Sequence, residues 1–251
     1  MVIIISNIKQ KHKKAKIFHP KKANNMSDTE YNYQHFNPRD YNFTIFNGPK
    51  AGEKYIDFSA TTLEGKEVFL SDYLDKPIVL DTGSITCPMY ANTTIEMNKL
   101  QKEYPNVHFL LLYIREAHPG GKTQSVKTME EKISHAKLTD KYYNEQREIL
   151  IDSLDGNAHN LYGSMPNMTY VIGTDGVVKF RANWTNIDAL KAILEKIDTD
   201  IIEKQDFYDI VKPRPWIAIR TLLIGGVSAM IEFFMGLPQL MRQHKEVKSK
   251  S

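Results

Sequence analysis

The sequence has very little cysteine, because Cys87 is the only one among 251 residues. One cysteine cannot form an intrachain disulfide, a dithiol redox pair or a multi-cysteine zinc site. A secreted module held together by disulfides is therefore excluded, and a reducing compartment such as the cytoplasm is the better expectation. We also expect neither a metal ion nor a bound cofactor.

The first 27 residues lack acidic side chains and carry seven lysines. The whole chain has a net charge of +3, so the remainder carries 3 − 7 = −4 and is mildly acidic. We therefore expect no nucleic-acid partner, and we interpret residues 1–27 as a basic, disordered leader with Met26 as an alternative natural start. The apolar stretch 2–5 is too short for a signal peptide, whose apolar core needs about 7–15 residues.

A long apolar run without charges is also missing. The most apolar stretch, 216–237, contains Arg220 and Glu232, whereas a membrane-spanning helix needs about 20 residues with few charges. This stretch fits a helix docked on the body or on a second copy in a homodimer, a helix lying on a membrane surface, or a span. In a helix, its small and polar residues share one side: Thr221, Gly225, Ser228, Ala229, Glu232 and Gly236. We expect the helical appendage 199–251 to serve attachment or assembly rather than chemistry.

The composition that is present is ordinary for a soluble globular protein, with 41% apolar and 25% charged residues. It excludes a mainly disordered chain, a collagen-like fibre and a polytopic membrane protein. Residues 28–53 are polar and aromatic without periodicity, so we expect an irregular segment that packs on the body through its aromatic rings. The folded body then covers 54–198, which fits one domain of about 150 residues with appendages.

Strand and helix patterns alternate within this body. A β-hairpin is expected at 55–70, and the buried strands 77–82 and 107–114 enclose a helix at 87–104. Such a βαβ unit makes its two strands parallel. The later patterns are a helix at 128–143, a strand at 149–151, a helical turn at 158–162, a strand hairpin at 169–181 and an amphipathic helix at 187–197. This order predicts an α/β fold with a mixed sheet flanked by helices, which is the thioredoxin-like architecture.

Cys87 follows the first buried strand and precedes the helix, at the sheet edge where open α/β sheets place their sites. A thiol at a helix N-terminus faces unpaired N–H groups and the positive end of the helix dipole, which favour the thiolate. We therefore expect Cys87 to be reactive, with a pKa below about 8. The alternative is a buried structural cysteine, since a free cysteine often behaves as a small hydrophobic residue.

Glu116 and His118 follow the second buried strand, so their loop lies at the same sheet edge as Cys87. A histidine near a thiol can stabilise the thiolate or deliver a proton, and a carboxylate can hold the imidazole in one tautomer. Pro166 comes just before an expected strand and resembles the cis-proline of thioredoxin-like proteins, which faces their active cysteine. These side chains are expected to surround one site.

Several motifs together resemble the iodothyronine deiodinases, which are thioredoxin-fold enzymes that remove iodine reductively from thyroid hormones. Residues 83–88 (GSITCP) resemble the active-site run Gly-Ser-x-Thr-selenocysteine-Pro, and residues 109–119 (FLLLYIREAHP) resemble the strand and Glu-Ala-His signature of that family. Residues 134–140 (SHAKLTD) and 165–172 (MPNMTYVI) resemble two further segments. The likeness covers roughly 54–198.

The resemblance implies that Cys87 takes the place of the selenocysteine nucleophile and that Glu116, His118 and His135 match residues that relay protons. It also implies substrate loops that contain Ser84, Thr86, Pro166 and Met168. Met168 stands where the family has an arginine for the hormone's carboxylate, and a methionine cannot supply that charged fork. Native thyroxine is therefore expected to be a poor substrate. Because no second cysteine can resolve an intermediate, an external thiol is the expected reductant.

The sequence thus predicts a thiol-dependent oxidoreductase in which the Cys87 thiolate removes a halogen, such as iodine, from an aromatic small molecule. One alternative is a one-cysteine thiol peroxidase, because Ser84 lies three residues before Cys87 as a Thr or Ser does in peroxiredoxins. Against this alternative, Leu80 occupies the position of their motif proline. A second alternative is a non-enzymatic binding module that uses the fold as a scaffold. Peripheral membrane contact through 216–237 is compatible with each of them.

Overall fold

The centre of the fold is a pair of parallel strands whose side chains are buried on both faces. Strand β3 (Ile78–Gly83) is buried along its whole length and pairs in parallel with β4 (His108–Tyr113). Helix α1 (Pro88–Glu103) connects the two strands. The predicted βαβ unit is therefore confirmed, and both strands end at the same edge of the sheet.

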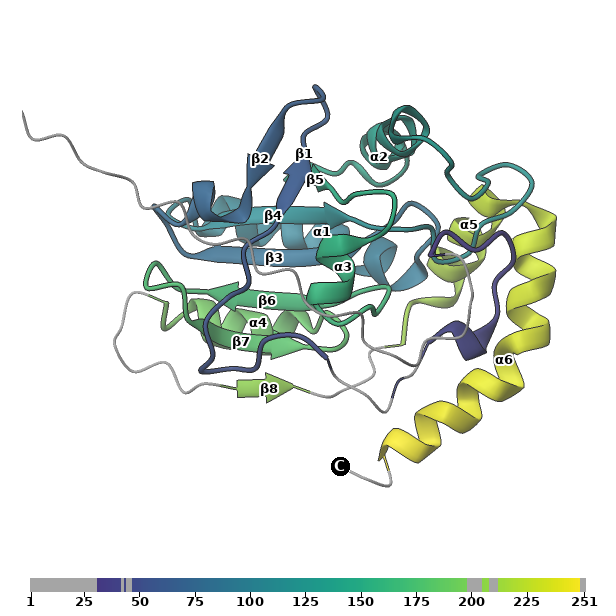
Figure 1. The fold of residues 1–251 in the computed structure, drawn as a ribbon. Helices are drawn as coiled ribbons and strands as arrows, with labels where there is room; N and C mark the ends of the chain where they lie inside the picture. The colour runs from purple at the N-terminus through teal and green to yellow at the C-terminus, as the bar shows by residue number, and fades with distance from the viewer. Residues whose placement is uncertain (1–30, 42, 44–46, 198–204, 208–211, 249–251) are drawn as a thin grey trace, which may run out of the picture.

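The computed structural model describes five stretches of the chain: 31–41, 43, 47–197, 205–207 and 212–248. The other strands are β1 (Ser59–Thr61), β2 (Glu67–Phe69), β5 (Glu148–Ile151), β6 (Thr169–Ile172), β7 (Val178–Ala182) and β8 (Gln205–Phe207). They form one sheet in the order β2-β1-β5-β4-β3-β6-β7-β8 (Figure 1). Strands β1 and β2 make the predicted hairpin, and β6 is antiparallel to both β3 and β7. This mixed sheet confirms the thioredoxin-like α/β fold.

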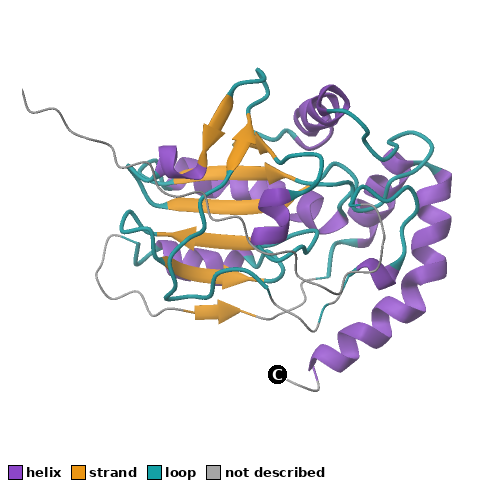
Figure 2. Ribbon diagram, viewed as in Figure 1, coloured by secondary structure: helices purple, strands orange, loops and turns teal. Residues whose placement is uncertain are grey.

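Helices cover both faces of the sheet (Figure 2). Helix α1 and helix α4 (Ile187–Leu194) lie behind the sheet in the view of Figure 1, and the short helix α3 (Asn157–Leu161) lies in front of it. Helix α2 (Met129–Tyr143) begins with a capping box, in which Thr128 and Glu131 satisfy each other's backbone N–H groups. Two short 3-10 helices, η1 (Pro38–Asp40) and η2 (Leu70–Tyr73), complete the elements before β3.

The described residues of the aromatic-rich segment pack on the body, where four of their rings are buried: Tyr33, Phe36, Tyr41 and Phe43. The guanidinium of Arg115 lies 4.8 Å from the ring centroid of Tyr33 and 5.1 Å from that of Tyr41. These cation–π contacts attach the segment to the loop after β4. The predicted leader, residues 1–27, lies outside the described residues.

Strand β8 pairs in parallel with β7, and the sequence pattern did not predict it. The Asp206 carboxylate accepts two hydrogen bonds from the Arg181 guanidinium, at 3.0 and 2.9 Å. Three residues are too few for a recognisable strand period, so this pairing depends on tertiary contacts. The sheet therefore extends beyond the body expected at 54–198.

The apolar stretch 216–237 is not one helix. Helix α5 (Pro215–Gly225) and helix α6 (Val227–Lys248) meet at Gly226, whose φ of 103° favours glycine over any other residue. Their predicted small side faces the body, because a Cβ at Gly225 would lie 2.6 Å from the backbone oxygen of His118. None of the helices in the described part of the chain is both long and apolar enough to cross a membrane.

Candidate active site

The loops that follow β3 and β4 are hydrogen-bonded to each other at the sheet edge. The Ala117 N–H donates to Ser84 Oγ at 3.1 Å, and the His118 N–H donates to Thr86 Oγ1 at 3.1 Å. Each serine or threonine hydroxyl thus satisfies a buried backbone donor of the other loop. Ser84 and Thr86 are therefore positioning residues, which hold the cysteine loop against the loop of the Glu-Ala-His signature.

Glu116 is the centre of a buried network behind the cysteine loop. One carboxylate oxygen accepts from the hydroxyl of Thr86 at 2.6 Å and from its N–H at 3.3 Å. The other oxygen accepts from the Tyr113 hydroxyl and lies 3.2 Å from Nδ1 of His135. Since an ionised carboxylate can only accept, Nδ1 of His135 carries a proton. The structure thus brings Glu116 and His135 together.

The protonation of His135 depends on this carboxylate. Partial burial disfavours the charged imidazole, but the hydrogen bond that His135 donates to Glu116 and the negative charge of Glu116 prevail and raise the pKa of His135. Glu116→Gln is therefore expected to lower the pKa of His135, as followed by NMR titration of the imidazole. Glu131→Gln is the matched control, because this helix neighbour contributes charge without a hydrogen bond. An equal shift in both variants would contradict the assignment.

Cys87 is the N-cap of α1 and is only 1% exposed. Burial raises the pKa of its thiol to about 12, although the backbone N–H groups of Tyr90 and Met89 favour the thiolate. The carboxylates of Asp81 and Glu116 add to the increase. The prediction of a pKa below about 8 is therefore wrong for this structure, because desolvation outweighs the helix N-terminus.

A cavity of about 520 Å³ adjoins Cys87, within the usual range for small-molecule sites. Its lining is mostly apolar, and many of the side chains are aromatic: Phe36, Tyr41, Phe43, Trp184 and Phe233. Polar groups are few, and the lysines Lys212 and Lys245 are exposed. Neither lysine is among the site residues predicted from the sequence. The cavity suits a flat, largely apolar ligand with its reacting atom near the thiol.

His118 lines the same cavity as Cys87. Its ring lies between Phe36 and Phe233, with centroid distances of 4.2 and 5.3 Å. Its Nδ1 is buried and has no hydrogen-bond partner, and burial lowers the pKa of the imidazole to about 3. His118 is thus a neutral imidazole in the cavity that the thiol adjoins, whereas His135 contacts Glu116 on the other side of the cysteine loop. The two predicted histidines do not converge on one point.

The C-terminal helices build part of this cavity. Ala218 of α5 and several residues of α6 line it: Phe233, Leu237, Leu240 and Met241. The expectation that 199–251 serves only attachment or assembly is therefore wrong for α5 and α6. Their inner face covers the sheet edge that carries Cys87, which excludes water from the thiol.

Pro166 also lines the cavity, as its likeness to the cis-proline of thioredoxin-like proteins predicts. Its peptide bond is nevertheless trans, because no cis peptide bond occurs in the described residues. The chain turns instead at Gly163 and Ser164, which have φ values of 107° and 60°. The expected cis geometry is therefore wrong, while the expected placement near Cys87 is right.

Met168 does not line the cavity. Its side chain is fully buried in the main core, with its sulfur next to Gly163, and its N–H donates to Thr82 Oγ1 at 2.7 Å. Met168 belongs to the same core cluster as Phe36 and Trp184, which line the cavity, but it is not itself a lining residue. The expectation that native thyroxine is a poor substrate stays a prediction.

A buried charge network beneath the site was missed in the sequence. Arg147 donates to Asp81 at 2.9 Å and holds Glu145 with two hydrogen bonds at 2.9 and 2.7 Å. Asp81 belongs to β3, and Tyr90 of α1 donates to Glu145 at 2.7 Å. The network thus joins the strand and the helix on either side of the cysteine loop. A strand aspartate within the run PIVLDT was the one signal that could have indicated it.

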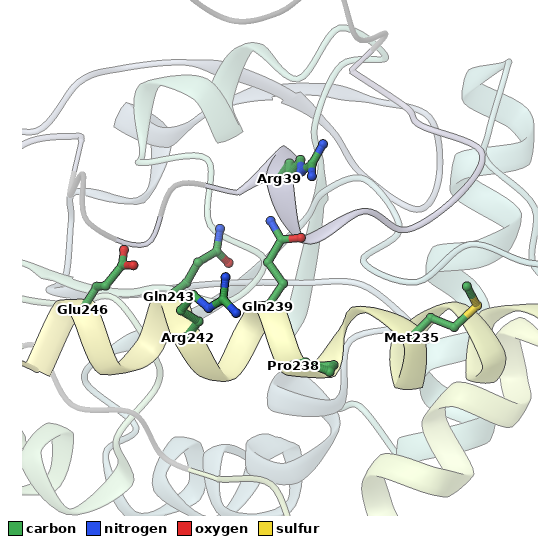
Figure 3. A pocket seen from close by; sticks show the side chains of 7 residues that line it. All are labelled: Arg39, Met235, Pro238, Gln239, Arg242, Gln243 and Glu246. Carbon is green, nitrogen blue, oxygen red and sulfur yellow. The ribbon is translucent and has the colours of Figure 1, made fainter.

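A second cavity of about 440 Å³ lies between η1 and α6 (Figure 3). It shares no lining residue with the Cys87 cavity, and its side chains are mainly polar: Arg39, Gln239, Arg242, Gln243 and Glu246. No three side chains of His, Cys, Asp or Glu come together as a metal-binding group in the ranges that the structure describes.

Known proteins resemble this chain in sequence and in fold. The curated relatives include type II iodothyronine deiodinases of Mus musculus, 28% identical over 46% of this chain and 49% of the relative, and of Bos taurus, 29% identical over 41% and 44%. The chain thus spans about half the length of the curated relatives it matches. An uncharacterised conserved protein of Geobacillus kaustophilus has a similar fold, with a TM-score of 0.52 at 15% identity over 64% of this chain and 89% of the other.

The sequence model of the iodothyronine deiodinases matches residues 2–198, a longer stretch than the motifs at 54–198 had indicated. This match, together with the thioredoxin-like fold, supports a thiol-dependent oxidoreductase. It covers Cys87, the Glu116 network and all eight predicted site residues. The chain belongs to the iodothyronine deiodinase family.

Proposed function

We propose that this protein removes iodine, or another heavy halogen, reductively from an aromatic small molecule, with an external thiol as reductant. The observation that carries the proposal is the cavity that joins the Cys87 thiol and a neutral His118 within aromatic walls. Aromatic rings favour the packing of an aryl ligand over that of a small polar oxidant. The family match supports the same reaction class.

Cys87 and His118 have complementary roles in this proposal. The Cys87 sulfur attacks the iodine while the thiol proton passes by way of the His118 imidazole to the ring carbon, and the carbon–iodine bond breaks in the same step. The first half-reaction thus converts an aryl iodide and the protein thiol into an arene and a protein sulfenyl iodide. Because the transfer is concerted with attack, no separate thiolate–imidazolium pair has to persist in a cavity that disfavours both charges.

An external thiol completes the cycle, because Cys87 has no partner cysteine in the chain. A first thiol displaces iodide from the sulfenyl iodide and forms a mixed disulfide. A second thiol releases the protein thiol and leaves as part of an external disulfide. The overall balance is aryl iodide plus two thiols giving arene, hydrogen iodide and one disulfide.

Glu116 and His135 support the cysteine loop from behind in this proposal. One carboxylate oxygen of Glu116 accepts two hydrogen bonds from Thr86. The other carboxylate oxygen of Glu116 contacts Nδ1 of His135. Because His135 is partly exposed whereas Glu116 is buried, the pair offers a path for protons between the loop and solvent. This path would carry to solvent the proton that each turnover releases with iodide.

The test is turnover of the full chain with excess dithiol, with iodinated phenols in one arm and hydrogen peroxide in the other. Cys87→Ser is expected to reduce iodide release by at least about a thousandfold, since a serine hydroxyl is a far weaker nucleophile at neutral pH. Circular dichroism checks that the variant folds. Peroxide consumption without iodide release would favour the one-cysteine peroxidase. No turnover in either arm would favour the binding module.

A further inference from the structure

The outer faces of α5 and α6 expose an unusual number of large apolar side chains. On α5 these are Trp216, Ile219 and Leu223, and on α6 they are Val227, Ile231 and Phe234. Each set has helical spacing for a single stripe. The two stripes adjoin along the chain at Gly226, where α5 ends and α6 begins. Six exposed apolar side chains on two adjoining helices mark a binding face rather than ordinary surface.

Basic residues accompany this apolar surface. Residues 212–248 contain six basic and two acidic side chains, a net charge of 6 − 2 = +4. Five of the basic residues are exposed. Lys212 and Lys245 line the Cys87 cavity and Arg242 lines the second cavity. Arg220 follows Ile219 on α5, and the guanidinium of Arg214 lies 5.8 Å from the ring centroid of Trp216, so that this charge borders the apolar stripe. Of the two acids, Glu232 is turned toward the body, where it accepts from His35 Nδ1 at 2.7 Å and from the Phe36 N–H at 3.0 Å. The stretch between Lys212 and Arg242 thus presents no outward carboxylate.

We propose that the α5–α6 surface docks peripherally on a membrane that contains anionic lipids, with the apolar stripes in the headgroup region and the basic residues on the lipid phosphates and carboxylates. The charge of the surface favours an anionic bilayer over a second copy of this chain, because two copies would bring like charges together. The helices lie on the bilayer rather than in it, because their inner faces pack on the body and line the Cys87 cavity.

Trp216 provides the readout for a test with the full chain. It is 65% exposed, whereas Trp184, the other tryptophan, is 5% exposed. Vesicles of phosphatidylcholine mixed with phosphatidylserine are expected to shift the tryptophan emission to the blue and to carry the protein into the pellet. Vesicles of phosphatidylcholine alone are expected to bind far less. Trp216→Phe should remove the spectral shift and leave most of the sedimentation.

Two sets of variants separate the contributions. Phe234→Ser is expected to weaken binding to the anionic vesicles by at least about tenfold, since it removes one inserted side chain. Arg214→Gln should cost about fivefold, an effect that high salt abolishes. Ile95→Ser is the matched control, because Ile95 is an equally exposed apolar residue on α1. It should leave binding unchanged.

Three results would overturn the proposal. Equal binding to both vesicle types would contradict a role for the basic residues in recognising anionic lipids. If the protein bound neither vesicle type, the proposal that this surface docks on a membrane would be wrong. A concentration-dependent dimer that Phe234→Ser dissociates, without vesicle binding, would assign the surface to contacts between copies of the chain.

Discussion

Replacing Phe233 by alanine is expected to speed the alkylation of Cys87 at neutral pH by at least about tenfold. Phe233 lines the cavity and packs on His118 from α6. Burial raises the pKa of Cys87 to about 12, whereas an uncovered cysteine titrates near about 8.5. Because only the thiolate reacts, complete uncovering would increase the reactive fraction by about three powers of ten.

The measurement is the rate of iodoacetamide alkylation as a function of pH, followed by mass spectrometry. The wild-type midpoint should lie well above that of a free cysteine, and Phe233→Ala should move it down. Phe234→Ala is the matched control, because the neighbouring side chain is 53% exposed and does not line the cavity. A wild-type midpoint at or below about 8.5 would mean that α6 does not cover the thiol in solution.

The β3–α1–β4 unit and the meeting of its two loops could be predicted from the sequence because they depend on local signals. Continuous apolar runs define buried strands, and the connection through a helix makes them parallel. The ends of parallel strands then bring Cys87 and Glu116 to one edge without any knowledge of side-chain contacts. The ends of the strands do not, however, fix whether a side chain in these loops points into the cavity or into the core.

The pKa of Cys87 was predicted in the wrong direction because its largest cause is not local. The N–H groups at the start of α1 act on the thiol as expected. The desolvation comes from burial in a cluster that includes residues distant in sequence, such as Ala117 and Ile224 of α5. Local sequence patterns do not indicate which distant helix packs over a given residue, so the position of α6 near Cys87 could not be predicted.

Met168 illustrates a different limit. The likeness to the family placed Met168 in a substrate loop from its position along the chain, and that position alone does not fix whether the side chain enters the cavity or the core. Here the residue immediately before β6 (Thr169–Ile172) is fully buried in the core. Pro166, two residues earlier, reaches the cavity. The substrate preference is therefore to be sought first among the lining residues.

Arg147→Met is expected to lower the free energy of unfolding by about 3–5 kcal/mol, because it leaves two buried carboxylates without their cation. Arg147, Asp81 and Glu145 are all buried in one network. Burial raises the pKa of Asp81 despite the charge of Arg147, because burial disfavours the ionised form of this carboxyl group. In sequence, a charged run at 145–148 resembles ordinary surface, so this effect could not be predicted from composition.

The measurement is equilibrium unfolding in urea, with Lys179→Met as the matched control. Lys179 pairs with Asp175 at 2.7 Å across one turn, but this pair is largely at the surface, where such pairs contribute about 1 kcal/mol or less. Because Arg147 links β3 to α1 through Asp81 and Glu145, its variant should lose Cys87 chemistry and cooperative unfolding together. A stable Arg147→Met protein that unfolds like the Lys179→Met control would contradict a structural role for the buried network.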